Sequence, residues 1–324
     1  MVYFGFSLIR QNLRKLLFLL TFLINSVFSF GQEKDSCYVG IYVKALYDLS
    51  PSDFSFGADF YIWNNSKDSV ELFRKIEIIN AKSMDVYSQF TEEDGNSFVS
   101  YLNCKAQLTH DWDLKNYPFD NQTLEIQLEA QEAIEYIYLH EDQNGFKLDK
   151  NLQIPGWKID NYEVMKSLVT YPSNFGFRHT SIKDKRFNHI SFVIELSRKS
   201  WGVYFKLFMG LFIAFLVSYL TFFIKPIYVD PRFGVCIGGL FASVANKYVV
   251  DANIPATIGF SFVDMVHLGN FFFIFATLVL SAISLKLYTQ GKEVKSKLLD
   301  RHSSIAVLIC YILYNLILIL VANV

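Results

Sequence analysis

The feature that most constrains this chain is a change in composition near Trp201, after which apolar residues dominate. Three of the segments that follow are long and apolar enough to cross a bilayer as helices: Trp201–Ile224, Phe262–Leu285 and Ile305–Val321. A bilayer core takes about 20 apolar residues in a helix, and only helices and closed barrels satisfy their backbone hydrogen bonds there. Residues 200–324 are therefore predicted to form a helical membrane domain.

One more segment, Phe233–Val250, lies between the first two of these and is less apolar. It holds three glycines together with Ser243, Asn246 and Lys247. Because a helix this polar rarely faces lipid, it is expected inside the bundle or against water. The pattern indicates a pore-lining helix, and a buried helix with small packing residues is the alternative.

Residues 1–31 have the parts of a secretory signal peptide. Arg10, Arg14 and Lys15 form the basic region. An apolar run follows over residues 16–28, and small residues stand at positions 29 and 31. An uncleaved anchor helix is the less favoured interpretation, because the apolar run is short. The mature chain is expected to begin near Gln32.

Residues 32–199 alternate apolar and polar side chains in several stretches, including residues 39–45, 54–62 and 190–196. A period of two is typical of a half-buried strand. Turn signals such as Asp94-Gly95 and Pro155-Gly156 separate these stretches. Many short strands with this punctuation predict an all-β domain, either an immunoglobulin-like sandwich or a barrel.

Basic residues gather between the last two apolar segments, at Lys286, Lys292, Lys295, Lys297 and Arg301. Two acidic residues oppose them there, Glu293 and Asp300. An excess of positive charge marks a loop as cytoplasmic. Four crossings then place both ends of the membrane domain outside, where the signal peptide also sends the β domain. We expect a multi-pass protein of the cell membrane, with the β domain in the periplasm if the membrane is a Gram-negative inner membrane.

Composition argues against several other classes of function. The formal net charge of −1 gives no sign of a nucleic-acid partner. The histidines of the β domain are scattered, and no nucleophile motif, phosphate loop or metal-ligand spacing accompanies them. We predict that the chain is not an enzyme and holds no metal or cofactor. Cys37 and Cys104 share the β domain and could pair if they lie close together.

The most distinctive stretch of the β domain covers residues 110–124, His-Asp-Trp-Asp-Leu-Lys-Asn-Tyr-Pro-Phe-Asp-Asn-Gln-Thr-Leu. Tyr117-Pro118 is an aromatic-proline step, the kind of bond most often found cis in a turn. From Leu124 onward, apolar and acidic or amide residues alternate, which predicts a strand. The aromatic residues of the loop are costly in water, so we expect the loop to dock against an apolar surface.

This stretch resembles the signature loop of the pentameric ligand-gated ion channels. Asp113-Leu114, Tyr117-Pro118-Phe119-Asp120 and Gln122 all stand at that family's spacing. His110 and Leu124 occupy its two cysteine positions, so the loop disulfide is absent, as in prokaryotic members. The order of signal peptide, β-sandwich and four helices is also similar to the family throughout. One departure is the first helix, where Gly210 or a neighbour replaces the family's proline.

The resemblance implies a homopentamer that is surrounded by membrane lipid and encloses a pore for ions. Pro255, in the loop after the second helix, sets the family's register for that helix. The register implies a pore stripe at Gly234, Gly238, Phe241, Ala245 and Tyr248, with Asp230 at the cytoplasmic mouth. Phe241 would be an apolar constriction that gates by dewetting. If the helix is rotated, Ser243, Asn246 and Lys247 would share the lumen instead.

The family's spacing also implies how the two domains communicate. Residues Tyr117, Pro118, Phe119 and Asp120 would press on the loop that contains Pro255, and the turn beginning at Asp48 would press beside it. Asp120 and Arg198 are expected to form a partly buried ion pair. Asp230 favours cations, although Arg232 lies two residues away and would have to point elsewhere.

The ligand is the least readable part of the function. The segment with Tyr171, Phe175 and Phe177 is similar to the family's loop that closes over a ligand, and aromatic rings there would favour a cation. Glu129 and Gln131 stand where amine-binding members carry an aromatic residue. Their presence weakens the interpretation as an amine site, and the acidic residues of this region leave proton sensing open. A non-conducting membrane receptor or sensor on the same fold is the alternative function.

Overall fold

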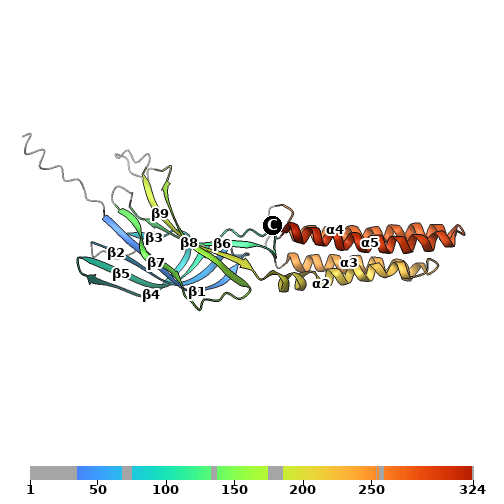
Figure 1. Cartoon of the computed structure of the whole chain (residues 1–324), viewed down its shortest axis with the longest axis horizontal. Helices are drawn as coiled ribbons and strands as arrows, with labels where there is room; N and C mark the ends of the chain where they lie inside the picture. Colours follow the sequence, from blue (N-terminus) through green and yellow to red (C-terminus); the bar gives the residue numbers. More distant parts are fainter. Residues whose placement is uncertain are drawn as a thin grey trace, which may run out of the picture.

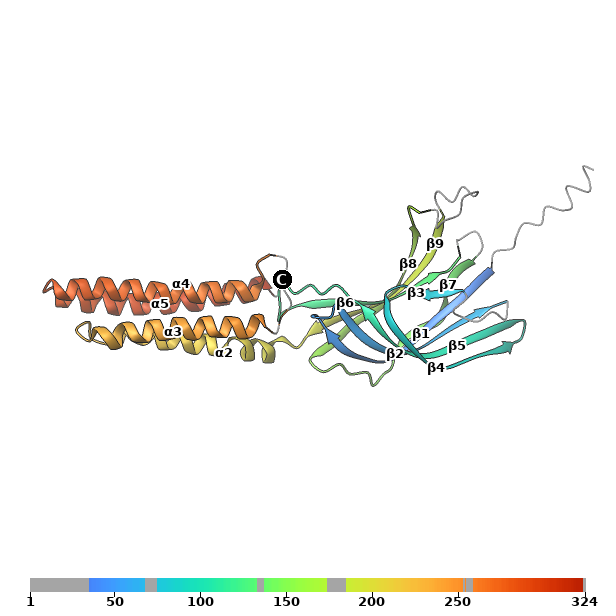
Figure 2. The same cartoon turned by 180° about the vertical axis from the view of Figure 1, so that it is seen from behind.

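The computed structural model describes residues 35–67, 75–132, 137–173, 185–252, 254 and 259–322. These residues form a β domain and a helical domain that follow one another along the long axis of the molecule (Figure 1). The same end-to-end arrangement is visible from behind (Figure 2). The signal peptide predicted at residues 1–31 lies outside the described residues.

The described part of the β domain has nine strands in two sheets. The five-stranded sheet has the order β4-β5-β2-β1-β7, and the four-stranded sheet has the order β3-β6-β9-β8. Neighbouring strands pair antiparallel, except that β1 and β7 are parallel. The bounds of the first sheet are β4 Ala81–Asp94, β5 Ser97–Thr109, β2 Ser55–Ser66, β1 Asp35–Ser50 and β7 Ile137–Leu148. Those of the second are β3 Ile76–Ile78, β6 Asn121–Ala130, β9 Arg186–Arg198 and β8 Trp157–Thr170.

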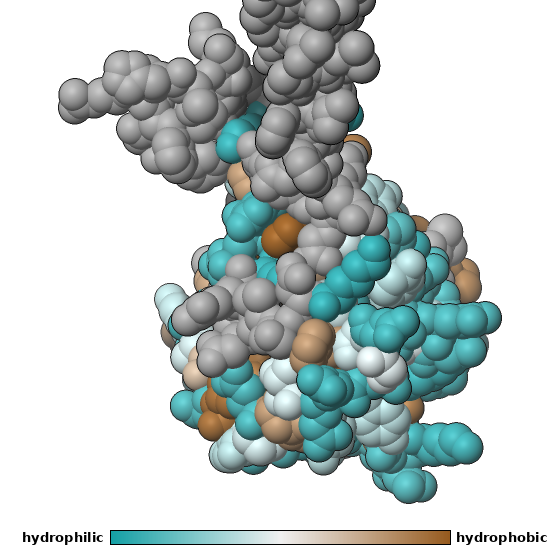
Figure 3. Space-filling view, turned by 90° about the vertical axis from the view of Figure 1, so that its left-hand side faces the viewer, coloured by the Kyte–Doolittle hydropathy of each residue, from teal (hydrophilic) through white to brown (hydrophobic). Residues whose placement is uncertain are grey.

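The two sheets share one hydrophobic core, to which both contribute alternate residues. On β2 the buried side chains include Phe56 and Phe60, and on β6 they include Leu124 and Ile126. The alternation predicted from the sequence therefore builds a sandwich. At the end of the β domain farthest from the helices, hydrophilic residues predominate among those described (Figure 3).

Cys37 and Cys104 are both buried, and neither belongs to a disulfide. In the strand register, Cys104 on β5 lies opposite Phe60, which lies opposite Val43 on β1. Cys37 is six residues before Val43 on the same strand, which corresponds to roughly 20 Å at about 3.3 Å per residue. The two thiols therefore do not form the disulfide that their shared domain allowed.

Among the described residues, four helices follow the β domain, and each is long and apolar enough to cross a membrane. They are α2 Ser200–Tyr219, extended by the 3-10 helix η2 Leu220–Phe223, α3 Val229–Asp251, α4 Phe262–Thr289 and α5 Glu293–Ala322. The C-terminal end of α5 returns to the side of the β domain (Figure 1). The predicted order of a β-sandwich and four membrane-length helices is confirmed.

The basic segment after α4 differs from the prediction. It was expected to be a loop up to Ile305, but α5 begins at Glu293, and only Gln290–Lys292 connect α4 to it. Lysine, arginine, glutamate and leucine are good helix formers, so the helix continues beyond the apolar stretch. At 1.5 Å per residue, its 30 residues span about 45 Å, more than the bilayer core requires.

Candidate pore face and coupling junction

The residues of the predicted pore stripe all lie on one exposed side of α3. Gly234, Gly238, Phe241, Ala245 and Tyr248 follow one another at steps of four and three and are exposed in the single chain. Phe241 is 70% exposed and Tyr248 is 73% exposed. Asp230 precedes the stripe by one helical turn and is also exposed. The stripe is thus a continuous face that α2, α4 and α5 of the same chain leave uncovered.

The other side of α3 is hydrogen-bonded to α4. Asn270 donates from Nδ2 to Ser243 Oγ at 2.7 Å, and Asn270 Oδ1 accepts from Tyr311 on α5 at 2.9 Å. Ser243 and Asn270 are completely buried. One turn further, Asn246 Oδ1 lies 3.1 Å from Nε2 of His267. These contacts fix the rotation of α3 about its axis.

Lys247 is also directed toward α4. Its ammonium group donates to Asp264 and to Asp251, each at 2.6 Å. Asp264 accepts in turn from Ser261 in a capping box that begins α4. All three residues of the rotated alternative therefore contact other groups of the same chain. Their placement argues against that alternative and favours the first register.

At the opposite end of α3, Arg232 is fully buried and points into the bundle. Its Nη2 donates to Asp300 Oδ1 at 2.6 Å, and its Nη1 donates to Asp300 Oδ2 at 3.1 Å and to the Ile224 carbonyl at 2.6 Å. Asp300 belongs to α5. The charge of Arg232 is therefore compensated within the bundle, whereas Asp230, two residues earlier on α3, is exposed.

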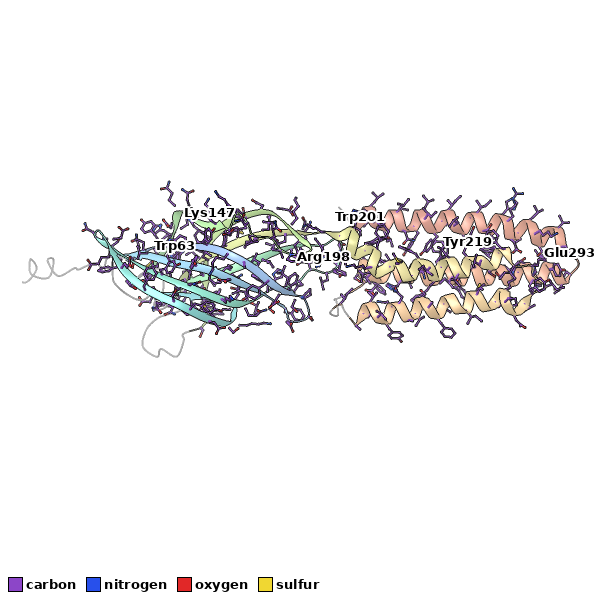
Figure 4. The ribbon with its side chains drawn as sticks, turned by 90° about the horizontal axis from the view of Figure 1, so that it is seen from below. Trp63, Lys147, Arg198, Trp201, Tyr219 and Glu293 are labelled. Atoms are coloured by element: carbon purple, nitrogen blue, oxygen red, sulfur yellow. The ribbon has the colours of Figure 1, made fainter. Side chains whose placement is uncertain are left out.

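The signature loop and the end of β9 meet in a second arginine–aspartate pair. Arg198 donates from Nε to Asp120 Oδ1 at 2.6 Å and from Nη2 to Asp120 Oδ2 at 2.9 Å. The guanidinium also lies 4.0 Å from the ring centroid of Trp157 and 4.8 Å from that of Tyr117. Burial raises the pKa of Tyr117, and the nearby Arg198 opposes this effect. In Figure 4, Arg198 lies at the helix-facing end of the β domain, close to Trp201.

Phe119 connects this pair to the membrane helices. Its ring centroid lies 5.6 Å from that of Trp201, 5.6 Å from that of Tyr204 and 5.5 Å from that of Phe262. The backbone N–H of Phe262 donates to the Lys115 carbonyl at 2.8 Å. The loop therefore contacts both α2 and α4, as expected of an aromatic loop that docks on an apolar surface.

The remaining predicted coupling residues are only partly placed. The Tyr117-Pro118 bond is cis, as predicted. Asp48 lies near the end of β1 with a left-handed φ of 47°. Pro255 lies outside the described residues, but Ile254 beside it packs against the cores of both domains.

At the predicted ligand region, Tyr171 donates its hydroxyl to the two carboxylate oxygens of Glu129, at 2.9 and 2.7 Å. Glu129 is 8% exposed and faces Glu77 directly across the β3–β6 pair. Burial, the hydrogen bond to Glu129 and the charges of both glutamates raise the pKa of Tyr171 to about 12. Gln131 donates its backbone N–H to the Lys75 carbonyl at 2.9 Å. Phe175 and Phe177 lie outside the described residues.

Comparison with known proteins bears on this arrangement. No family model matches the chain. It is similar to a proton-gated ion channel of Gloeobacter violaceus, with 22% identity over 247 residues, 76% of this chain and 65% of that protein. It is also similar to a serotonin-gated chloride channel of Caenorhabditis elegans, with 22% identity over 211 residues, 62% of this chain and 40% of that protein.

The resemblance to the pentameric ligand-gated ion channels is confirmed. The chain spans less than two thirds of the length of each of these relatives. Both are named as channels and neither as an enzyme, in agreement with the prediction that this chain is not an enzyme. The chain is a multi-pass membrane protein whose β domain lies outside the cytoplasm. One relative is named as a chloride channel, so similarity to these channels does not itself determine the ion.

Two residues of this arrangement were missed from the sequence. Glu77 lies on β3, and a strand of three residues is too short for its alternation to be recognised. His110 was noted only as a replaced cysteine, yet its Nε2 lies 3.3 Å from Oε1 of Gln122. The available signal was that a polar residue, His110, replaces a cysteine of the same motif that contains Gln122.

Proposed function

We propose that this chain is one subunit of a pentameric ligand-gated ion channel in which α3 lines the pore. The observation that carries the proposal is the two-sided character of α3. Its polar residues Ser243 and Asn246 bind α4, while the stripe through Phe241 is left exposed. A ring of identical subunits around an axis would cover such a face and give it a lumen.

Phe241 would supply the gate. Repeated in each subunit, its ring forms an apolar collar that excludes water when the helices approach one another. The glycines at 234 and 238 leave the lumen wide on the cytoplasmic side, where an added Cβ at either position would meet nothing within 4 Å. The narrowest level is therefore expected at Phe241 or at the ring of Tyr248.

We infer a preference for cations. Arg232 is held by Asp300 inside the bundle, so the ring of charge offered to the lumen at the cytoplasmic mouth is that of Asp230. At the other mouth, Asp251 is half exposed and shares Lys247 with Asp264. Rings of carboxylates favour cations in channels of this general design.

Control of the gate would pass through the signature loop. Phe119 is packed among aromatic residues of α2 and α4, and Asp120 ties the same loop to the last residues of β9. A shift of β9 relative to β6 would therefore move the signature loop together with α2 and α4. A ligand changes the balance of the two arrangements only by binding one of them more tightly.

The ligand we propose is a proton or a small organic cation at the Glu129 site. Glu77 and Glu129 lie directly opposite each other, and Tyr171 shields Glu129 from water. Two neighbouring carboxylates attract a positively charged guest. Phe175 and Phe177 follow Tyr171 in the segment that resembles the family's ligand-closing loop, outside the described residues.

The domain limits that we propose follow the same division. Residues 1–31 would be the signal peptide, residues 32–199 the ligand-binding sandwich and residues 200–324 the pore domain. The proposal is supported by the ends of the secondary structure, since β9 ends at Arg198 and α2 begins at Ser200.

The test is a current measurement on the full-length protein in planar bilayers or oocytes, with steps to acidic pH and then small amines. Wild type is compared with Phe241→Ala and with the control Phe272→Ala, a phenylalanine on α4 that is 65% exposed. The expected result is a leak current in Phe241→Ala alone, with a reversal potential that follows the cation gradient. Silence in all three proteins, with pentamers present at the surface, would contradict the pore and favour a non-conducting receptor.

A further inference from the structure

We propose that His110 is a proton-binding residue that acts on the junction between the domains through Gln122 and Asp120. Acidification would change the state of His110 and, through this hydrogen-bond chain, the position of the signature loop. The inference rests on the proposed function in one respect, because the Asp120–Arg198 junction is where we place the coupling. Its first test does not require an ion current.

The position of His110 makes it a titratable group enclosed on one side only. Its ring packs edge-on against Phe56, with centroids 6.2 Å apart, and against Trp112, with centroids 4.7 Å apart. Its backbone N–H donates to the Phe54 carbonyl at 2.9 Å. On the other side the residue borders a cavity of about 540 Å³ on the surface of the β domain. Protons can therefore reach the ring without any rearrangement of the core.

Gln122 connects His110 to the ion pair. Its Nε2 donates to Asp120 Oδ2 and to the Asp113 carbonyl, each at 2.8 Å. Its Oε1 accepts from the Asp113 N–H at 3.3 Å. These contacts fix which end of the amide carries the oxygen, so His110 Nε2, at 3.3 Å from that oxygen, must be the donor. The neutral ring then carries its proton on Nε2, and a second proton is added at Nδ1.

Charged groups lie near His110 on the loop that follows it, on β6 and on β4. Asp111 follows it in the loop, Glu125 lies on β6 and Lys82 on β4, and all three border the same cavity. The Lys82 ammonium donates to the Asp53 carbonyl. Beyond Gln122 lie Asp120 and its partner, the guanidinium of Arg198. A protonated ring would be attracted by the two nearby carboxylates and repelled by Lys82 and Arg198.

In the described arrangement, burial lowers the pKa of His110, and the hydrogen bond to Gln122 and the charges of Asp111 and Glu125 only partly offset it. This arrangement therefore stabilises the neutral imidazole ring more than the protonated one. An arrangement in which the ring moves toward the cavity binds the proton more tightly, and acid shifts the population toward it. Because the ring is bonded to Gln122, such a movement removes one of the contacts that orient the amide against Asp120.

The experiment uses the full-length protein in lipid nanodiscs and follows tryptophan fluorescence as the pH is lowered. A protonated imidazole quenches a neighbouring indole more than a neutral one does, and Trp112 is in direct contact with His110. Wild type is compared with His110→Gln, which keeps a hydrogen-bond donor but cannot titrate, and with Trp112→Phe as the control for the source of the signal. A third variant, Asp111→Asn, removes one of the carboxylates that favour the protonated ring.

We expect wild type to show a quenching transition with its midpoint below about pH 6.5, the ordinary value for histidine. The transition should be lost in His110→Gln and Trp112→Phe, and it should move to lower pH in Asp111→Asn. The same transition in His110→Gln, or an unchanged midpoint in Asp111→Asn, would overturn the proposal. If His110→Gln does not fold, the midpoint of Asp111→Asn decides.

Currents then separate this proposal from the proposed function. A fluorescence transition that depends on His110 in a protein that never conducts would support the proton site and contradict the channel. Proton-evoked or amine-evoked currents with no such transition would support the channel and contradict the site. If both hold, His110→Gln should shift the pH dependence of the current without changing the conductance of the open pore.

Discussion

A buried arginine–aspartate pair lies at each end of the helical domain, and the two pairs differ in what surrounds them. Arg198 and Asp120 lie between the β domain and the helices, with side chains 13% and 1% exposed. Arg232 and Asp300 lie at the other end of the bundle, with side chains 0% and 10% exposed. The more deeply buried side chain is therefore the aspartate in the outer pair and the arginine in the inner pair.

The difference suggests two roles. At the outer end, Arg198 has aromatic faces as well as a carboxylate, and Asp120 has a second donor in Gln122. Arg198 and Asp120 therefore each keep a partner when one contact changes, which suits a junction between two domains that move. At the inner end, Arg232 depends on Asp300 and one carbonyl, and its Nε is buried with no hydrogen-bond partner among the described residues. That site suits an anchor that joins α3 to α5.

The largest effect is expected from Asp300→Ala. Removing one partner of a buried pair leaves the other charge uncompensated, at a cost of about 3–5 kcal/mol. We expect a strong loss of folded oligomer, measured by size-exclusion chromatography and thermal unfolding in detergent. Glu293→Gln, also near the start of α5 but on an exposed residue, is the control. A stable Asp300→Ala oligomer would contradict the anchor.

Asp120→Asn should reduce stability less and affect the response to ligand more. Arg198 remains stacked on Trp157 and can be hydrated from a cavity of about 410 Å³ that borders the pair. We expect a loss of about 1–3 kcal/mol and oligomers that assemble but respond weakly to acid or amines. Asp113→Asn, on the same loop but exposed, should respond normally. Equal loss of oligomer in Asp120→Asn and Asp300→Ala would remove the distinction between the two sites.

Replacing each arginine with lysine tests the same difference between the outer and inner pairs. Arg198→Lys keeps a charge for Asp120 but loses the planar stacking, so a moderate change in the response is expected. Arg232→Lys loses the fork that binds Asp300 at two atoms, at a position where the arginine side chain is completely buried, and should be less stable than Arg198→Lys. The two variants are compared by their unfolding temperatures. The opposite ranking would show that the outer pair is the more rigid one.

The smallest effect concerns pH. Because the pKa of His110 is lowered in the folded protein, the unfolded chain binds more protons near the ordinary histidine value. The contribution of the neutral ring to stability is complete above about pH 6.5 and is lost as the pH falls below it. The unfolding temperature of wild type should therefore fall more than that of His110→Gln between about pH 6.5 and about pH 5. Identical pH dependence in the two proteins would show that His110 makes no such contribution.

Much of this arrangement could be predicted from the sequence, and the exceptions have physical reasons. The strands of the sandwich follow from alternation, and the pairing of Asp120 with Arg198 was expected from the motif around Tyr117 and Pro118. The beginning of α5 was misplaced because charge was read as a sign of a loop, although charged residues also form helices. The rotation of α3 could not be decided, because a polar residue suits a lumen and a hydrogen-bonded neighbour equally well. The contacts of Ser243, Asn246 and Lys247 with residues of α4 separate the two.

The central claim is that one face of α3 lines a water-filled pore and the opposite face binds α4. It is tested most directly by cysteine accessibility at two positions of similar size, Ala245→Cys on the exposed stripe and Ser243→Cys on the buried side. Each is treated with a water-soluble thiol reagent, and the change in current is compared with that of wild type. We predict that the reagent alters the current of Ala245→Cys and leaves that of Ser243→Cys unchanged. Modification of Ser243→Cys alone would contradict the claim.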